Sequence, residues 1–529
     1  MSKSTKVFLF LVLGVIILFF GGRYFIFWKI KQTVITKIEE LKSKGILIEY
    51  ESIDVNSFSG SIKITDVKVD EEGPDSICVA GATLSEIEVQ GLSVISYLLK
   101  KKISIASIYL KEPWIQYSSR SRKFNSTTEG QQSGDKPGLK GIEIELFKID
   151  SGKVEMVDSA SCKVTMKGRL NLSVKNFSII NLSSDSVQWK VESVVANGIE
   201  IDLPTRFYNM KLQQVAYYQN DQMIQLDSLF LKTTLDRAEF AKRSAKQVDQ
   251  FNVVMPSLQI LGFDPGKSAQ PSIIAREINL HFDMDVYRDK RYPRAWRKPK
   301  ILPIPFLRKF SFPIKIDSLI ILPSKIVYHE HPEKGEGVGK ISFNELKGGM
   351  YNISNDSTGE ASMRVYSKFM NAGDLNVNFT FPLEKQKLYT VKGSLTNFSM
   401  PSINTMLEPA AHIKIESGKM QAMKFDFSYD SKESNGELEL RYSDLKVVAI
   451  KDDEEKSTNK IVTLIIGALI KKKIDKNDPI DKRTGTIKWE RDTQKAILNY
   501  WWKSVFSGFK SVFGFNSSPK KGDDKKKKS

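Results

Sequence analysis

Hydrophobic residues alternate with polar or small residues along most of this chain, and this period of two constrains the fold more than any other feature. The alternation is strictest in the stretches Cys162–Val174, Ile278–Val286, Leu375–Phe381, Tyr389–Leu395 and Phe425–Tyr429. Successive side chains of a β-strand point to opposite sides, so each stretch predicts a strand with one apolar and one wet face. A chain of 529 residues with so many strands must close, sandwich or curl to hide the apolar faces. We therefore expect a mainly β fold.

Several alternating positions are candidates for an apolar lining, because each belongs to an uninterrupted stripe on one face of its strand. They are Val164, Met166, Leu170, Leu172, Ile278, Leu280, Phe282, Met284, Val377, Phe379, Phe381, Phe425 and Phe427. Residues on the opposite face, such as His281 and Asn378, should meet water. Helical periodicity is rare, and it favours short helices over Ile30–Lys44, Ser93–Lys100 and, more weakly, residues 236–251.

The amino terminus predicts a membrane anchor. Lys3 and Lys6 precede an uninterrupted apolar run from Val7 to Phe20. A helix over residues 7–28 would span about 33 Å, enough for a hydrocarbon core of about 30 Å, with Arg23 and Trp28 at the membrane interface. A cleaved signal peptide is the alternative, but no A-x-A-like cleavage site follows the run. We predict a single-pass inner-membrane protein whose bulk lies in the periplasm of a bacterium with two membranes.

The positive charge is concentrated in two places. The net charge is +18, yet residues 288–310 hold nine basic residues and one acid, and residues 520–529 hold six lysines and two acids. Two short segments therefore carry most of the excess, which argues against a protein coated in nucleic acid. The basic residues of the first segment are expected to face anionic headgroups or phosphate-bearing partners, or alternatively to form a solvated loop.

No motif for catalysis stands out. Residues 335–340 resemble a phosphate-binding loop but lack its first glycine and its Ser or Thr, and a hairpin loop explains them better. His329 and His331 lack further ligands for a metal. Cys78 and Cys162 each lie in a strand pattern, as small hydrophobic residues would. We expect no enzyme activity, no catalytic residue, no metal and no cofactor.

Two segments interrupt the strands, and a short motif repeats along the chain. Residues 119–139 read as a flexible linker, and residues 287–313 as a basic, proline-rich crossover. A strand ending in Asp-Ser recurs at Phe147–Ser151, Ile224–Ser228 and Ile314–Ser318. Asp that bonds its own backbone would turn the chain there, and repetition of such a unit favours a sheet extended by stacking.

The carboxy-terminal part predicts a buried or interfacial helix, a strand and a second helix. The apolar run Ile461–Ile470 is too short to span a bilayer, and a strand follows at Gly485–Glu490. Residues 493–515 form a helical stripe that is rich in aromatic residues, with lysines beside it. Its candidate membrane-interface residues are Trp501, Trp502, Phe506, Phe509 and Phe513. Packing of this helix onto the sheet end is the alternative.

The order of these elements resembles that of AsmA-like envelope proteins, including members from Bacteroidota. The resemblance rests on an uncleaved anchor and on five stretches of sequence, which cover about a quarter of the chain. They are residues 48–69, 87–117, 393–427, 438–450 and 484–509. The resemblance implies an elongated, curled antiparallel β-groove, related in architecture to chorein-type bridge-like lipid transfer proteins. It also implies a role in phospholipid transport towards the outer membrane, without catalytic residues.

On this basis we expect a lipid-transfer or envelope-biogenesis protein that carries acyl chains in its groove, with phospholipid, the inner membrane and an outer-membrane or envelope complex as partners, and no nucleic acid. The alternative is an anchored β-rich scaffold or outer-membrane assembly factor without lipid cargo. The expected segments are a cytoplasmic tail, the anchor, a juxtamembrane helix, an amino-terminal β/helix module, the linker, the groove body, the crossover, an AsmA-like carboxy-terminal groove, a helix–strand–helix segment and a Lys-rich tail. Their bounds are 1–6, 7–28, 29–45, 46–118, 119–139, 140–286, 287–313, 314–457, 458–515 and 516–529.

Overall fold

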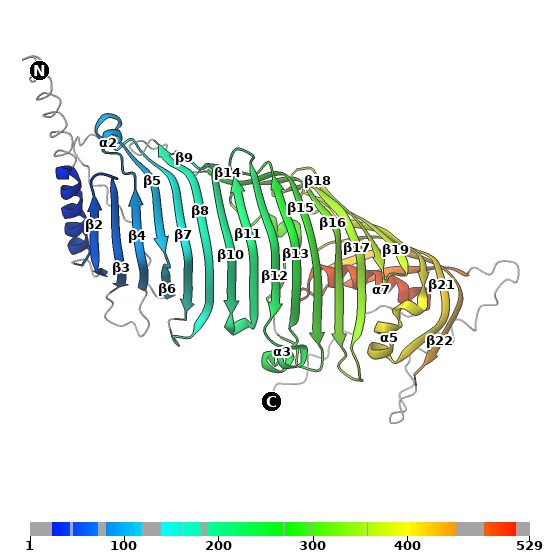
Figure 1. Ribbon diagram of the computed structural model, residues 1–529. Helices are drawn as coiled ribbons and strands as arrows, with labels where there is room; N and C mark the ends of the chain where they lie inside the picture. The colour runs from blue at the N-terminus through cyan, green and yellow to red at the C-terminus, as the bar shows by residue number, and fades with distance from the viewer. Residues whose placement is uncertain are drawn as a thin grey trace, which may run out of the picture. The chain divides into compact units, whose positions relative to one another are not determined.

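A computed structural model shows a mainly β protein, with 63% of the described residues in strands and 17% in helices. The structure describes residues 24–42, 46–71, 81–118, 139–158, 160–180, 188–267, 270–295, 298–356, 358–450 and 481–514. The chain divides into two compact units, Met1–Leu229 and Phe230–Ser529. Figure 1 shows the strands of each unit running side by side in a sheet. Each unit is described by itself below.

Unit 1 is a sheet in which most neighbours in the chain are also neighbours in space. Its strands are β1 (Ile46–Glu49), β2 (Ser52–Asn56), β3 (Ser61–Glu71), β4 (Gly81–Gln90), β5 (Lys102–Lys111), β6 (Trp114–Ser118), β7 (Gly141–Val157), β8 (Val164–Ile180), β9 (Gln188–Lys190), β10 (Ser193–Leu203) and β11 (Tyr208–Tyr218). Helix α2 (Val94–Lys100) joins β4 to β5, and the 3-10 helix η1 (Pro204–Arg206) joins β10 to β11. Strand β12 (Met223–Thr233) crosses the boundary between the units.

Unit 2 continues the same pattern with longer strands. They are β13 (Asp249–Leu261), β14 (Asp264–Lys267), β15 (Gln270–Asp289), β16 (Ile314–His331), β17 (Gly339–Ser354), β18 (Glu360–Phe369), β19 (Gly373–Pro382), β20 (Tyr389–Ser399), β21 (Ile413–Tyr429), β22 (Glu433–Ala449) and β23 (Asp481–Glu490). Its helices are α3 (Arg237–Ser244), α4 (Pro303–Leu307), η2 (Met400–Ile403), α5 (Asn404–Ala411) and α7 (Ile497–Val512). In Figure 1, α7 lies across the strands on one side of this sheet.

The expectation of a wholly antiparallel sheet is wrong, because the sheet is mixed. Strands β5 and β6 both pair parallel to β7, and β15 pairs parallel to β16. Parallel neighbours need a long connection that returns the chain to the starting end of the sheet. The two segments that interrupt the sequence pattern lie at these connections, between β6 and β7 and between β15 and β16. The second is a crossover within the sheet of unit 2, whereas residues 119–138 of the first, the predicted linker, lie outside the described residues.

The Asp-Ser repeat marks irregularities inside strands, and its interpretation as a turn is wrong. Strands β7, β12 and β16 run through Asp150-Ser151, Asp227-Ser228 and Asp317-Ser318 without ending. Ser151 and Ser228 adopt positive φ angles of 56° and 54°. The register between β7 and β8 shifts beside Ser151, which identifies a β-bulge, and a bulge bends its strand. At Ser151 the repeat therefore bends its strand.

The short helices of the first half follow their caps. Helix α2 forms where it was predicted, because the Ser93 hydroxyl accepts a hydrogen bond from Ser96 N and caps the first turn. Helix α3 ends at Ser244, well before the predicted end at residue 251. Its cap Asp236 accepts from Glu239 N, and Ala245 closes it in a left-handed conformation. The chain then enters β13 at Asp249.

No helix within the described ranges is long and apolar enough to cross a membrane. The predicted anchor run Val7–Phe20 lies outside those ranges, as does the apolar run Ile461–Ile470. A helix occupies residues 24–42, so it covers most of the stretch Ile30–Lys44 that the sequence marks as helical.

Cys162 is not the buried strand residue that the alternation suggests. It lies in the turn between β7 and β8, is exposed, and has a positive φ of 54°. The structure records Cys162 as disulfide-bonded. The sequence has one other cysteine, Cys78, which lies outside the described residues.

The disulfide gives a direct test of the fold of unit 1. Thiol titration of the full chain, unfolded in denaturant without reductant, should find no free thiol, and reduction should release two per chain because the sequence has two cysteines. Cys162→Ser should leave one titratable thiol. Two free thiols in the unreduced chain from an oxidising compartment would contradict the bond.

Candidate functional site

One face of unit 1 carries apolar residues that pair with one another from strand to strand. We call such a row of register partners a rung. Rung A consists of Val55, Ile62, Val89, Ile108, Phe147, Val174, Val194 and Tyr217. Every member is half-buried. Because register partners point to the same side of a sheet, rung A is a continuous apolar stripe across the unit.

Two further rungs widen this stripe. Rung B consists of Ile53, Ile64, Ile87, Leu110, Ile149, Leu172, Ala196 and Val215. Rung C consists of Ile48, Val69, Ala82, Ile115, Val154, Gly168, Ile201 and Met210. The row between A and B on the other face includes Asp54, Lys63, Glu88 and Lys148. Unit 1 therefore has one apolar face, called the inner face here, and one polar outer face.

Three of the four predicted lining residues of β8 lie on this inner face. Leu172 belongs to rung B, and Leu170 and Met166 follow it at every second position of the strand. The register shifts between Met166 and Val164, where β8 has one extra residue, so alternation does not place Val164 on the same face. All four are half-buried, so their side chains remain partly open to solvent. Whether lipid lines the inner face stays a prediction.

Most members of the three rungs were missed by sequence reasoning, and the reason is the bulges. In β7 the inner residues Phe147 and Ile149 have odd numbers, whereas Val154 and Met156 have even numbers. Ser151 adds one residue between them, so the strand keeps its face while the sequence pattern changes phase. A phase change beside Asp-Ser or Gly is the signal that could have found them.

Unit 2 has an inner face of the same kind, and it contains the other predicted lining residues. One rung consists of Leu258, Leu280, Ile321, Gly348, Val365, Val377, Gly393, Phe425, Leu438 and Gly485. The next consists of Ile260, Ile278, Leu319, Met350, Met363, Phe379, Val391, Phe427, Gly436 and Ile487. Phe282 and Met284 extend the stripe along β15, and Phe381 extends it along β19.

The two ends of this inner face differ in how far they are covered. On β15 the predicted residues Ile278, Leu280, Phe282 and Met284 are half-buried. On β19 and β21 the predicted residues are buried, with exposed fractions of 9% or less. They are Val377, Phe379, Phe381, Phe425 and Phe427. These five belong to a closed hydrophobic core beneath α7.

Helix α7 closes that core by direct contact with the strands. The ring of Trp501 lies 4.4 Å from that of Phe379, and the fully buried hydroxyls of Ser504 and Ser434 are 2.7 Å apart. A Cβ atom on Gly485 would lie 2.4 Å from the Gly508 carbonyl oxygen, so glycine is needed for the helix to approach β23 so closely. The alternative expectation, a helix that packs onto the sheet end, therefore describes α7 in this structure.

The predicted membrane-interface residues fall into several groups. Trp501 and Phe509 pack against the core and Phe513 is 4% exposed, so these three are core residues. Trp502 is 45% exposed and stacks on half-buried Phe506, with 5.7 Å between the ring centroids. Trp28, in the helix over residues 24–42, is 49% exposed. Arg23 lies outside the described residues.

This difference predicts unequal effects of two neighbouring tryptophans. Trp501→Ala should lower the free energy of unfolding of unit 2 by about 3 kcal/mol, because it opens a cavity beside Phe379. Trp502→Ala should change it by about 0.5 kcal/mol or less, because its ring is exposed. Denaturant unfolding of the full chain, followed by circular dichroism, compares them. Equal effects would mean that α7 does not pack as described.

Three basic residues at the start of the crossover form ion pairs within the protein. Arg288 forms two hydrogen bonds of 2.6 Å with Asp249, and Lys290 and Arg291 pair with Glu330 and Asp289 at 2.6 Å. The first two pairs join neighbouring strands. That the basic residues of 288–310 face lipid headgroups stays a prediction.

The crossover is also tied to the segment that joins β23 to α7. Lys300 N donates to Thr493 O, and the Arg491 guanidinium donates to Lys300 O, both at 2.7 Å. Burial lowers the pKa of Arg491, whose guanidinium lies 5.9 Å from the Tyr500 ring. The crossover and α7 thus stabilise each other.

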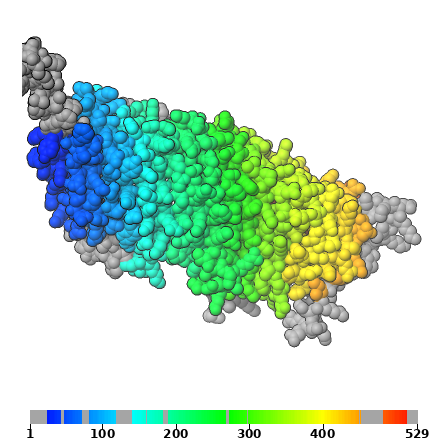
Figure 2. All heavy atoms as spheres, in the orientation of Figure 1, coloured from blue at the N-terminus to red at the C-terminus, as the bar shows by residue number. Residues whose placement is uncertain are grey.

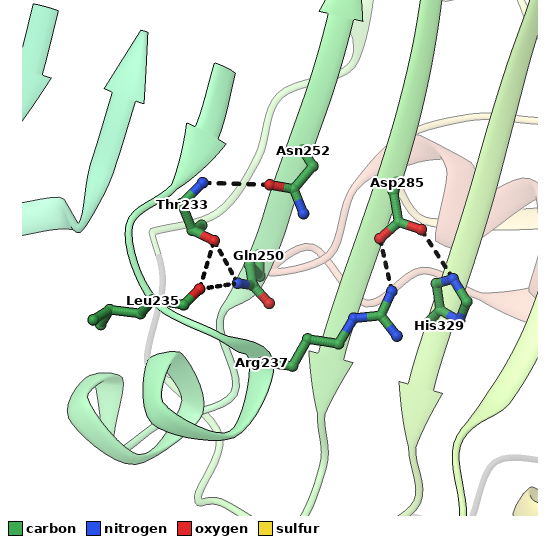
Figure 3. Close-up of polar contacts among 7 residues, drawn as sticks. All are labelled: Thr233, Leu235, Arg237, Gln250, Asn252, Asp285 and His329. Atoms are coloured by element: carbon green, nitrogen blue, oxygen red, sulfur yellow. Dashed lines mark hydrogen bonds and ion pairs between the residues drawn. The ribbon is translucent and has the colours of Figure 1, made fainter. Parts of the chain in front are cut away.

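Figure 3 shows a polar cluster that anchors α3 to the sheet. The Gln250 side-chain amide donates to the Thr233 hydroxyl at 2.7 Å and to Leu235 O at 3.2 Å. Beside it, Asp285 accepts from Arg237 at 3.0 Å and is 2.9 Å from His329 Nε2. Burial, reinforced by the charge of Arg237, lowers the pKa of His329 although Asp285 opposes this. His329 is therefore neutral near pH 7.

A lowered pKa makes His329 a source of acid sensitivity. As the pH falls below about 6.5, the ordinary pKa of histidine, His329 binds a proton in the unfolded chain but not in the folded chain. The free energy of unfolding therefore decreases as the pH falls. We expect the denaturation midpoint of His329→Gln to fall less than that of the parent between about pH 7 and about pH 5. The same dependence in both proteins would show that His329 does not contribute.

The described ranges hold no group of three or more His, Cys, Asp or Glu that could bind a metal ion. His331 Nδ1 lies 3.0 Å from Pro332 O, so the two histidines of the His-Glu-His sequence make separate contacts. A hollow of about 480 Å³ lies on the outer face of unit 2, lined by polar side chains such as Asn378, Lys392 and Asp426.

Comparison with known proteins adds no identification. No protein-family model matches the sequence, and a search of curated proteins finds no match.

Proposed function

We propose that this protein is an AsmA-like, inner-membrane-anchored lipid-transfer protein that holds phospholipid acyl chains on the inner faces of its sheets. The observation that carries the proposal is the inner face of unit 1. Rungs A, B and C form an apolar surface across β1–β11, and nearly all of their residues remain half-buried rather than closed in a core. An apolar surface of this extent generally marks a binding site.

The energetics favour acyl chains as the ligand. Each CH₂ group that leaves a membrane for water costs about 0.8 kcal/mol, so a sixteen-carbon chain costs roughly 13 kcal/mol. An apolar face removes most of this cost, and headgroups can stay in water beside it. The rungs offer aliphatic side chains without a defined polar pocket, so they suit ligands that bind through apolar area. Phospholipids meet this requirement.

Separate observations support the curvature of the sheet and the location of the protein. Bulges such as the one at Ser151 bend strands, which favours a curled groove over a flat sheet. The apolar run Val7–Phe20 supports the anchor, and exposed Tyr24, Phe25 and Trp28 follow it as interfacial aromatic residues would. The disulfide at Cys162 fits an oxidising compartment such as the periplasm.

A scaffold or assembly factor without lipid cargo is the second candidate, and unit 2 favours it. There α7 covers one end of the inner face, and the aromatic side chains pack together beneath it as in the core of a structural domain. In this case unit 1 would bind a protein rather than lipid.

Photo-crosslinking separates the two candidates. A photoreactive phenylalanine analogue at Phe147, on rung A, should form phospholipid adducts in the full chain as isolated from membranes. The matched control is the neighbouring residue Lys148, which is exposed on the outer face. Intact-mass analysis should show lipid adducts at position 147 and none at 148. Equal adducts at both positions, or adducts only with protein at 147, would overturn lipid binding.

A further inference from the structure

One end of the unit 1 sheet exposes a cluster of large apolar side chains. Helix α2 leaves β4 and re-enters at β5 at this end, and the β2–β3 turn lies beside it because Leu92 N donates to Gly60 O at 3.0 Å. The rim, as we call it, consists of Phe58, Ile95, Tyr97, Leu98 and Leu99. Their exposed fractions are 78%, 57%, 52%, 57% and 79%. Helix α2 has no buried residue, so packing within the described protein does not explain its apolar composition.

The rim protrudes from the sheet. In Figure 1, α2 stands at the upper end of the strands of unit 1, and in the space-filling view its light-blue atoms project at the upper edge. The rung next to it, formed by Ile103, Ile142, Ile179 and Trp189, is also apolar. The apolar surface therefore reaches the ends of the strands at this rim.

A run of basic residues borders the rim. Lys100, Lys101 and Lys102 follow Leu99 directly, and the backbone ties Lys140 to the same place through a 2.9 Å hydrogen bond to Lys101 O. Lys102 pairs with Glu143 at 2.6 Å, and Lys101 lies over the Tyr97 ring at 5.9 Å. Aliphatic and aromatic side chains beside lysines form the pattern of a segment that lies at an anionic membrane surface.

We propose that this rim docks onto the surface of an anionic phospholipid bilayer, with Leu98 and Leu99 in the acyl boundary and Lys100 and Lys101 at the headgroups. The contact brings the part of rung A on β4 and β5 closest to the bilayer. Acyl chains would enter the inner face there. The inference rests on the proposed membrane attachment of the chain, but it does not require that lipid is carried along the rungs.

The test uses the full chain in two kinds of vesicle, one containing phosphatidylglycerol and one of phosphatidylcholine alone. A photoreactive phenylalanine analogue replaces Leu99. The matched control carries it at Thr205, an exposed residue of η1 at the opposite ends of the strands. We expect phospholipid adducts at position 99 and none at 205, with more in the anionic vesicles. Lys100→Gln and Lys101→Gln should each lower the yield at 99 by about fivefold.

Several outcomes would overturn docking. They are equal labelling at 99 and 205, capture of a second copy of the chain or another protein at 99, and a yield at 99 that does not depend on phosphatidylglycerol. The Phe147 probe, read in the same vesicles, keeps the two proposals apart. Adducts at 99 without adducts at 147 support the rim and remove lipid cargo, and the reverse result removes the rim alone.

Discussion

Strand register is the constraint on which the rest of this structure depends. A slip of one residue would move every side chain of a strand to the other face, and it would break rungs that are apolar across all their partners. The bulges preserve this register because those of neighbouring strands lie side by side. Ser151 N donates to the Asn171 side chain at 2.8 Å, and Gly198, with a positive φ of 58°, lies beside Asn171 on the next strand. The strands therefore bend together, and the apolar residues return to the same face beyond the bend.

The apolar rungs of the two units contribute free energy in different ways. In unit 1 the apolar side chains shield one another from water only in part. A ligand that covers them removes further apolar area from water, and this burial favours binding. In unit 2 such burial occurs within the chain, since Trp501 and its neighbours on α7 cover the aromatic side chains of β19 and β21. The first face has the capacity to bind, whereas the second contributes stability. Within unit 2, the difference between its two ends follows from the position of a single helix.

The strand content was readable from the sequence, and so were the apolar residues of the regular stretches, because a period of two records side-chain direction directly. Most rung members of unit 1 were not, because a bulge changes the phase of the pattern. The strictest stretches were found on β8, β15, β19 and β21. The mixed pairing was not readable, since a crossover and a linker look alike in composition and only the register shows that β7 returns beside β5. The cover over Phe379 was missed for a related reason. An amphipathic pattern such as that of α7 predicts that a helix has an apolar face. It does not indicate whether lipid or a sheet packs against that face.

The hydrogen bonds between α7 and β23 have a consequence for association between molecules. Ser507 and Ser511 accept hydrogen bonds from the backbone N–H groups of Lys488 and Thr486, at 3.1 and 3.0 Å. Those N–H groups belong to a strand whose partner in the sheet is β22, so without the serines they would offer a template for a strand of another chain. A protein made by adding strand after strand carries an inherent risk of continuing into its neighbour. By accepting these two hydrogen bonds, the hydroxyl groups of α7 occupy donors of β23 with which a strand of another chain would otherwise pair.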